Sequence, residues 1–119
     1  MSSDFFYFCG INLKMNREEI IERIKEASLK VIPSGGKLYL YGSQARGDAR
    51  EDSDWDLLIV LDKDNITESD HDEVSYPFFE LGWLLDVEIH PFLISKKEWE
   101  RRSFTMFYKN VTKEQIALC

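Results

Sequence analysis

The feature that most constrains the fold of this chain lies between residues 38 and 61, where two short apolar runs flank a polar loop. The first run ends in Gly42-Ser43, and ten residues then separate Ser43 from Asp54-Trp55-Asp56. The second apolar run follows at once, from Leu57 to Leu61. This pattern predicts a strand, a glycine turn with a short helical piece, and a second strand.

The residues of this loop suit a metal and a phosphate. Side chains two apart on a strand point to the same face, so Asp54 and Asp56 are expected to project together. Two neighbouring carboxylates favour a cation between them, and oxygen ligands favour a hard ion such as Mg²⁺. The Gly42-Ser43 turn offers backbone N–H groups and a hydroxyl to a phosphate.

The alternative is a solvated acidic loop, made of Asp48, Glu51, Asp52, Asp54 and Asp56. Against it, Asp56 is followed directly by five apolar residues. A carboxylate at the mouth of a buried strand needs a partner or a metal, because burying an unpaired charge costs free energy. We therefore favour the metal site.

These residues resemble the signature of the nucleotidyltransferase superfamily that includes DNA polymerase beta, which is Gly-Ser, about ten residues and then Asp-x-Asp. The fuller strings Gly42-Ser43-Gln44-Ala45-Arg46-Gly47-Asp48 and Ser53-Asp54-Trp55-Asp56-Leu57-Leu58 resemble its small prokaryotic branch, the minimal nucleotidyltransferases (MNT). The resemblance implies an α/β (α+β) nucleotidyltransferase fold, with a small mixed β-sheet flanked by helices.

The resemblance also implies the roles of individual residues. Asp54 and Asp56 would bind metal, with two Mg²⁺ ions expected, and would act in catalysis. Gly42 and Ser43 would bind the β- and γ-phosphates of a nucleotide. Arg46 would either point toward the triphosphate or brace the acidic loop.

A third catalytic and metal-binding carboxylate is implied on a strand beside Asp-x-Asp. Residues 85–94 are interpreted as that strand, because polar and apolar residues alternate along it. Either Asp86 or Glu88 can supply the carboxylate, and we favour Glu88 because it lies centrally in the run. His90 is interpreted as a strand-end residue rather than a ligand.

Three helices are predicted from periodicity and capping residues. The first covers residues 16–32, with Asn16 and Glu19 forming a capping box. The second covers 67–84, with a kink or a shifted start at Pro77. The third begins at Ser95. Residues 111–119 are expected to form a weakly helical tail.

Length and composition bound the possibilities further. The 119 residues are expected to form one domain, with 1–14 as a possible N-terminal extension. A formal charge of −7 argues against broad binding to nucleic acid, which needs a cationic surface. The two cysteines indicate a reducing cytoplasm rather than a disulfide scaffold, and no apolar stretch is long enough for a membrane span.

The expected activity is transfer of a nucleoside monophosphate, AMP from ATP, to a hydroxyl acceptor. Minimal nucleotidyltransferases of this size resemble the antitoxin half of HEPN–MNT toxin–antitoxin pairs, which implies a HEPN-type toxin as partner. Two alternatives stay open. One is a non-catalytic module that neutralises a partner protein by contact, and the other is a small-molecule (aminoglycoside-like) nucleotidyltransferase.

Overall fold

The computed structural model describes residues 15–50 and 52–119, so the predicted extension 1–14 and Glu51 lie outside the described part. The helices are α1 (Arg17–Val31), α2 (Ser43–Arg46), α3 (Glu68–Asp70), the π-helical turn η1 (His71–Ser75), α4 (Tyr76–Leu85), α5 (Lys96–Arg101) and α6 (Met106–Glu114). The strands are β1 (Lys37–Tyr41), β2 (Trp55–Leu61), β3 (Ile89–Ser95) and β4 (Ile116–Ala117). Within the described ranges, no helix has the length and apolar character needed to cross a bilayer.

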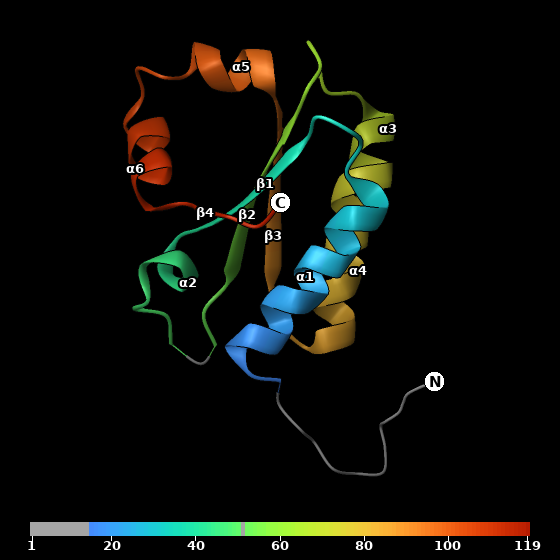
Figure 1. Ribbon diagram of the computed structural model, residues 1–119, viewed down its shortest axis with the longest axis vertical. Coiled ribbons are helices and arrows are strands. Elements are labelled where there is room, and N and C mark those ends of the chain that lie inside the picture. Colours follow the sequence, from blue (N-terminus) through green and yellow to red (C-terminus); the bar gives the residue numbers. More distant parts are fainter. Residues whose placement is uncertain (1–14, 51) are drawn as a thin grey trace.

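The strands form one mixed sheet in the order β3-β2-β1-β4 (Figure 1). β2 pairs with β3 in parallel, whereas β1 pairs antiparallel with both β2 and β4. This arrangement confirms the predicted small mixed sheet flanked by helices. The predicted weakly helical tail 111–119 is wrong in its second half, because Ile116–Ala117 pairs with Tyr39 and Leu40 at the sheet edge.

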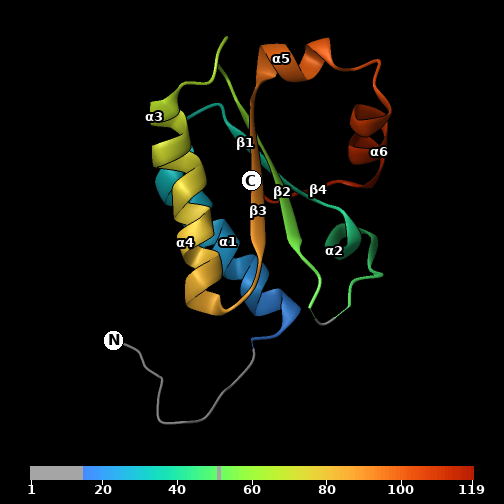
Figure 2. The same cartoon turned by 180° about the vertical axis from the view of Figure 1, so that it is seen from behind.

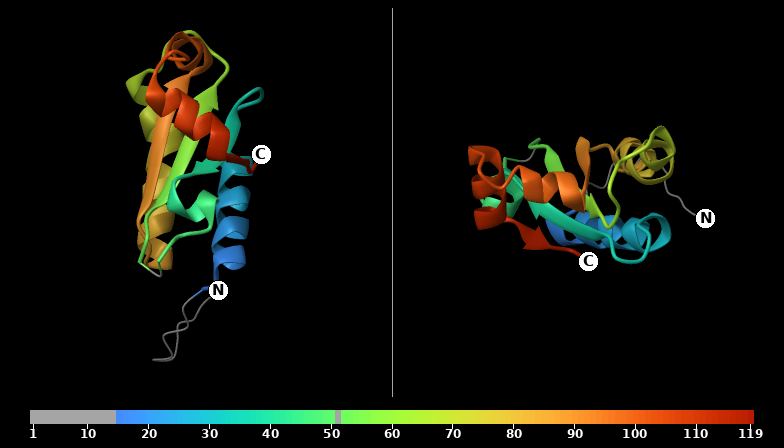
Figure 3. Two further views of the ribbon diagram at one scale, coloured as in Figure 1. Left: turned by 90° about the vertical axis from the view of Figure 1, so that its left-hand side faces the viewer. Right: turned by 90° about the horizontal axis from the view of Figure 1, so that it is seen from above.

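The two faces of the sheet are covered by different helices. Figures 2 and 3 show α1 and α4 on one side of the strands and α5 with α6 on the other. Along β2, Leu57 and Ile59 belong to the core beneath α1 and α4, whereas Leu58 and Val60 pack with α5 and α6. Because side chains alternate along a strand, Asp56 shares the face of Leu58.

Local capping signals predicted the first helix well. The Asn16 side chain accepts a hydrogen bond from the Glu19 N–H at 2.9 Å, and the Glu19 carboxylate accepts one from the Asn16 N–H at 3.0 Å. This reciprocal pair satisfies two backbone donors that a helix N-terminus otherwise leaves free. The predicted capping box of α1 is confirmed.

The predicted helix 67–84 is present as the continuous run of α3, η1 and α4. Thr67 caps it, since its hydroxyl accepts a hydrogen bond from the Asp70 N–H at 3.2 Å. Pro77 lies in the first turn of α4, directly after the π-helical turn. Proline lacks the N–H that would continue an i to i−4 ladder, and a π-helical turn is one way for a helix to absorb that loss.

The predicted strand 85–94 begins four residues too early. Leu85 ends α4, and Asp86 follows as its C-cap with φ 59° and ψ 44°, a left-handed conformation that Asp tolerates better than most residues. The observed strand starts only at Ile89. Asp86 and Glu88 therefore both precede β3, and only His90 of the three polar residues lies on it. The alternation of polar and apolar residues that suggested a longer strand runs through a helix end.

Candidate active site

The predicted site residues meet at the end of the sheet where β1 finishes and β2 and β3 begin. Tyr41 is the register partner of Asp56, and Asp56 is the register partner of His90. Just before the parallel pair, the Trp55 N–H donates a hydrogen bond to the Glu88 carbonyl at 2.8 Å. The backbone thus brings the Gly42 turn, the Asp-x-Asp segment and the start of β3 side by side.

Asp54, Glu88 and His90 form a cluster in which one ligand atom of each lies within 4.8 Å of the others. The imidazole lies between the two acids, with Nδ1 3.7 Å from the Asp54 carboxylate and Nε2 3.2 Å from that of Glu88. All three side chains are exposed, Asp54 at 49% and Glu88 at 73%. The cluster is open to an ion from solvent.

The sequence favoured His90 as a strand-end residue rather than a ligand, and the structure brings its imidazole beside two of the predicted ligands, Asp54 and Glu88. The parallel register sets it opposite Asp56 and next to Glu88. The available signal was the spacing, because His90 follows Glu88 by two residues just as Asp56 follows Asp54. Two parallel strands in register place such pairs side by side. His90 is the second residue of β3, so its expected place at a strand end is observed, and the expectation that it is not a ligand stays a prediction.

Asp56 lies deeper than the cluster, in a half-buried position. Burial raises the pKa of its carboxyl group, and the charges of Asp54 and Glu114 raise that pKa further, while His90 and Arg46 act in the opposite direction. A carboxylate that is costly to ionise in the free protein gains most from a bound cation. The oxygen-rich donor set around Asp56 therefore fits a divalent metal ion.

The Gly42 turn sits directly against Asp56. Gly42 has φ 78° and ψ −160°, a conformation open essentially to glycine alone. A Cβ atom at this position would collide with the Asp56 Oδ2 atom and lie 3.3 Å from its Cγ. Glycine is thus required both by the backbone conformation and by the approach of the carboxylate.

The turn continues into α2, whose position is held by two neighbours. The Arg17 guanidinium of α1 donates a hydrogen bond to the Gln44 carbonyl at 2.8 Å. The buried Gln44 side chain donates to the Ser53 carbonyl at 3.4 Å, just before Asp54. Gln44 therefore ties the glycine turn to the loop that carries the aspartates.

Arg46 and Glu114 meet beside the turn. The Arg46 guanidinium lies 3.3 Å from the Asp48 carboxylate and 3.3 Å from that of Glu114, and these acids raise its pKa. The Gly42 N–H donates to Glu114 Oε1 at 2.9 Å. Of the two predicted roles of Arg46, bracing the acidic loop through Asp48 is observed. Glu114, from the distant helix α6, carried no sequence signal.

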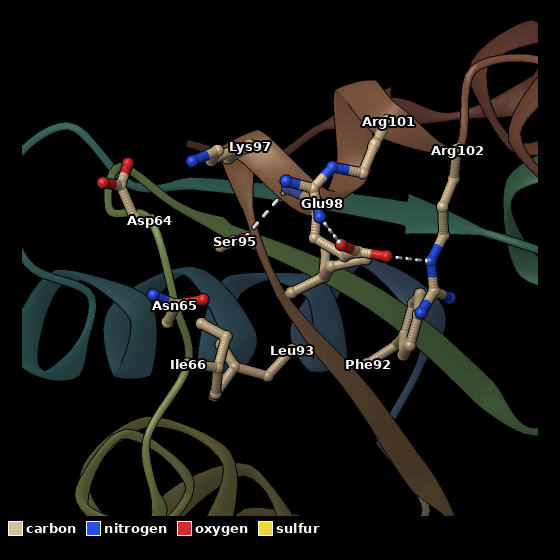
Figure 4. A pocket seen from close by; sticks show the side chains of 11 residues that line it. Asp64, Asn65, Ile66, Phe92, Leu93, Ser95, Lys97, Glu98, Arg101 and Arg102 are labelled. Carbon is tan, nitrogen blue, oxygen red and sulfur yellow. Dashed lines mark hydrogen bonds and ion pairs between the residues drawn. The ribbon is translucent and has the colours of Figure 1, made fainter.

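A cavity at the opposite end of the sheet holds none of these residues. It lies where β3 passes into α5, and Figure 4 shows Glu98 in it with both Arg101 and Arg102 turned toward its carboxylate. The two arginines lie 3.2 and 3.0 Å from Glu98. Its two arginines are already paired with Glu98, and it is separate from the carboxylate cluster.

Solved structures with a similar fold include the following three. A protein assigned as a minimal nucleotidyltransferase is 32% identical, with a TM-score of 0.58 over 86% of this chain and 95% of that one. A chain of a toxin–antitoxin complex with AMP-PNP is 20% identical, with a TM-score of 0.59 over 83% of this chain and 72% of that one. A chain of the tri-AMPylated Shewanella oneidensis HEPN toxin in complex with MNT antitoxin is 17% identical, with a TM-score of 0.57 and coverages of 87% and 72%.

The last two similarities, at low identity, establish likeness of fold alone. Comparison with curated proteins found no significant match. The family model of the nucleotidyltransferase domain, however, matches residues 17–112. That range spans most of the chain and contains the glycine turn, both aspartates and Glu88. The protein therefore belongs to the nucleotidyltransferase domain family of enzymes.

Proposed function

We propose that this protein is a magnesium-dependent nucleotidyltransferase that transfers AMP from ATP to a hydroxyl group. The observation that carries the proposal is the contact between the Gly42 turn and Asp56, with Asp54 and Glu88 alongside. The Gly42-Ser43 turn, here called the phosphate cradle, is thereby adjacent to the carboxylates proposed to bind metal. Phosphoryl transfer depends mainly on positioning and charge stabilisation, which such a pair can supply.

The proposed roles divide between the two parts of the site. Asp54, Asp56 and Glu88 would hold two magnesium ions, and the Gly42 and Ser43 turn would bind the β- and γ-phosphates. Magnesium, when bound, supplies the positive charge that stabilises the triphosphate oxygens as their charge develops. Asp56 is suited to this role because burial already disfavours its charged form without a cation.

In the proposed reaction an acceptor hydroxyl oxygen forms a bond to the α-phosphorus of ATP. The bond from that phosphorus to the oxygen bridging the β-phosphate breaks, and pyrophosphate leaves. Glu88, whose side chain is exposed, would accept the hydroxyl proton. AMP remains on the acceptor.

We further propose that the acceptor is a tyrosine side chain of a protein partner, a HEPN-type toxin in the cytoplasm. Likeness of fold to chains from two toxin–antitoxin complexes supports this assignment. The net charge of −7 suits a basic partner and opposes nucleic acid. Phe104 and Met106, exposed at 78% and 68%, offer apolar contact area on the same side of the sheet as Asp56.

Phe107 offers less exposed surface for such a contact than Phe104 and Met106. Its ring packs edge-on against Tyr41 and Phe92, with centroid distances of 5.9 and 5.7 Å. The sequence holds two aromatic clusters, at Phe5 to Phe8 and at Phe104 to Tyr108. The second is thus partly used to cover the sheet, and the first lies outside the described residues.

The test is co-expression with the product of the neighbouring gene, followed by mass spectrometry of the purified complex. An AMP adduct on a partner tyrosine, absent with the D56N variant, is the expected result. A stable complex without adduct in magnesium and ATP would instead favour a module that neutralises its partner by contact. Transfer onto a small molecule without complex formation would remove the antitoxin assignment and leave the chemistry.

A further inference from the structure

A carboxylate of the protein itself lies in the proposed phosphate cradle. Glu114 Oε1 accepts a hydrogen bond from the Gly42 N–H at 2.9 Å, and Oε2 lies 3.3 Å from the Arg46 guanidinium. The Gly42 N–H belongs to the turn assigned above to the triphosphate, and Arg46 is the cation beside that turn. Glu114 thus makes, with its own negative charge, the contacts that a phosphate oxygen would make.

The position is an unfavourable one for a glutamate in every respect except these contacts. Glu114 is the last residue of α6, and a helix C-terminus carries a negative partial charge that repels a carboxylate. Its side chain is only 20% exposed. It also lies close enough to Asp56 and Tyr41 for its charge to raise both of their pKa values. The Gly42 N–H and Arg46 offset these costs.

We infer that Glu114 is an internal competitor for the triphosphate. In the nucleotide-free protein it occupies the Gly42 N–H and Arg46, and it must withdraw before phosphate oxygens reach these donors. This inference rests on the proposed function, because it concerns regulation of the same site. It makes the C-terminal helix α6 a part of nucleotide binding.

The anchoring of α6 defines what has to move. Gln115 follows Glu114 with an extended backbone and leads directly into β4, which is hydrogen-bonded to β1 beside the turn. Val111, one turn earlier in α6, is buried against the sheet. Rotation of the Glu114 side chain away from Gly42 therefore frees the cradle without unfolding the helix.

The experiment measures ATP affinity in magnesium by calorimetry for the wild type, E114Q and E114A. E114Q removes the charge and keeps the shape and an acceptor, so it preserves the test if E114A does not fold. Loss of a charge-assisted hydrogen bond that competes with the ligand is expected to tighten ATP binding about tenfold in E114A, and less in E114Q. E100Q, an exposed glutamate on α5, removes the same charge away from the site and should leave affinity unchanged.

A second arm uses inorganic tripolyphosphate without metal, which probes the cradle separately from the carboxylates. It should show the same order of affinities. Equal or weaker ATP binding by E114A and E114Q would overturn the inference while leaving the proposed function intact. Failure of every variant, wild type included, to bind either probe would reject the proposed function, and the competitor with it.

Discussion

Replacing Gly42 with alanine should damage both the fold and the site, and the structure allows the cost to be divided. The backbone at Gly42, with φ 78° and ψ −160°, lies in a region that side chains rarely enter. The new methyl group would also collide with the Asp56 carboxylate and push it from its position. Two separate penalties therefore act at one residue.

The backbone penalty is about 1–3 kcal/mol for a non-glycine residue in this region. Displacing the packed Asp56 side chain adds about 1–2 kcal/mol, in the range measured for overpacking. G42A should thus lose about 2–5 kcal/mol of unfolding free energy. Gly47 offers a matched control, because it also has positive φ, 85°, but a Cβ there meets nothing within 4 Å. G47A should cost about 1 kcal/mol, the penalty for a left-handed alanine.

Urea unfolding followed by circular dichroism measures these differences through the transition midpoint and slope. The D56A variant completes a double-mutant cycle, because removing the carboxylate relieves the collision but not the backbone penalty. G42A and D56A should therefore couple by about 1–2 kcal/mol, with the double variant more stable than the sum of single effects predicts.

Two results would refute this reasoning. A G42A variant as stable as G47A would show that neither the conformation nor the contact is demanding. A coupling energy below about 0.5 kcal/mol, the usual scatter of additive sites, would show that Asp56 moves aside freely. In that case the close approach between cradle and carboxylate could not underlie the proposed chemistry.

Three further predictions concern the acids and His90. D54N and D56N should abolish magnesium-dependent ATP binding without unfolding the protein. Because the Asp56 pKa is raised in the fold, metal-free D56N should have an equal or slightly higher Tm than the wild type at neutral pH, and any advantage should fade as acid protonates wild-type Asp56. Unfolding of both variants would make these acids structural. E88Q should slow transfer severely, whereas D86N should retain activity and stability because Asn tolerates the left-handed cap, and the reverse ranking would reassign the third carboxylate. H90Q should move the acidic limb of the pH profile of metal affinity to higher pH, because the charge of His90 lowers the Asp56 pKa. An unchanged pH profile in calorimetric titrations of the metal would exclude that influence.

Local signals in the sequence were sufficient for the elements that carry the proposed cradle. Gly42 and the apolar run after Asp56 define a strand, a turn and a strand without reference to distant residues, and the structure has them in that order. The Asn16 and Glu19 box likewise set the start of α1. Such features depend on neighbours three or four residues apart, so the sequence alone contains their physical cause.

Tertiary structure decided which distant side chains join the turn. The left-handed cap at Asp86 separates that acid from β3, and the parallel register sets His90 opposite Asp56. Glu88, directly before β3, then lies close to Asp54 and His90. Glu114 reaches Gly42 from 72 residues away, because α6 packs across the face that Asp56 shares. No local pattern encodes a register or a helix docking; both arise from burial of apolar surface over the whole sheet, and that burial placed the competing carboxylate in the cradle.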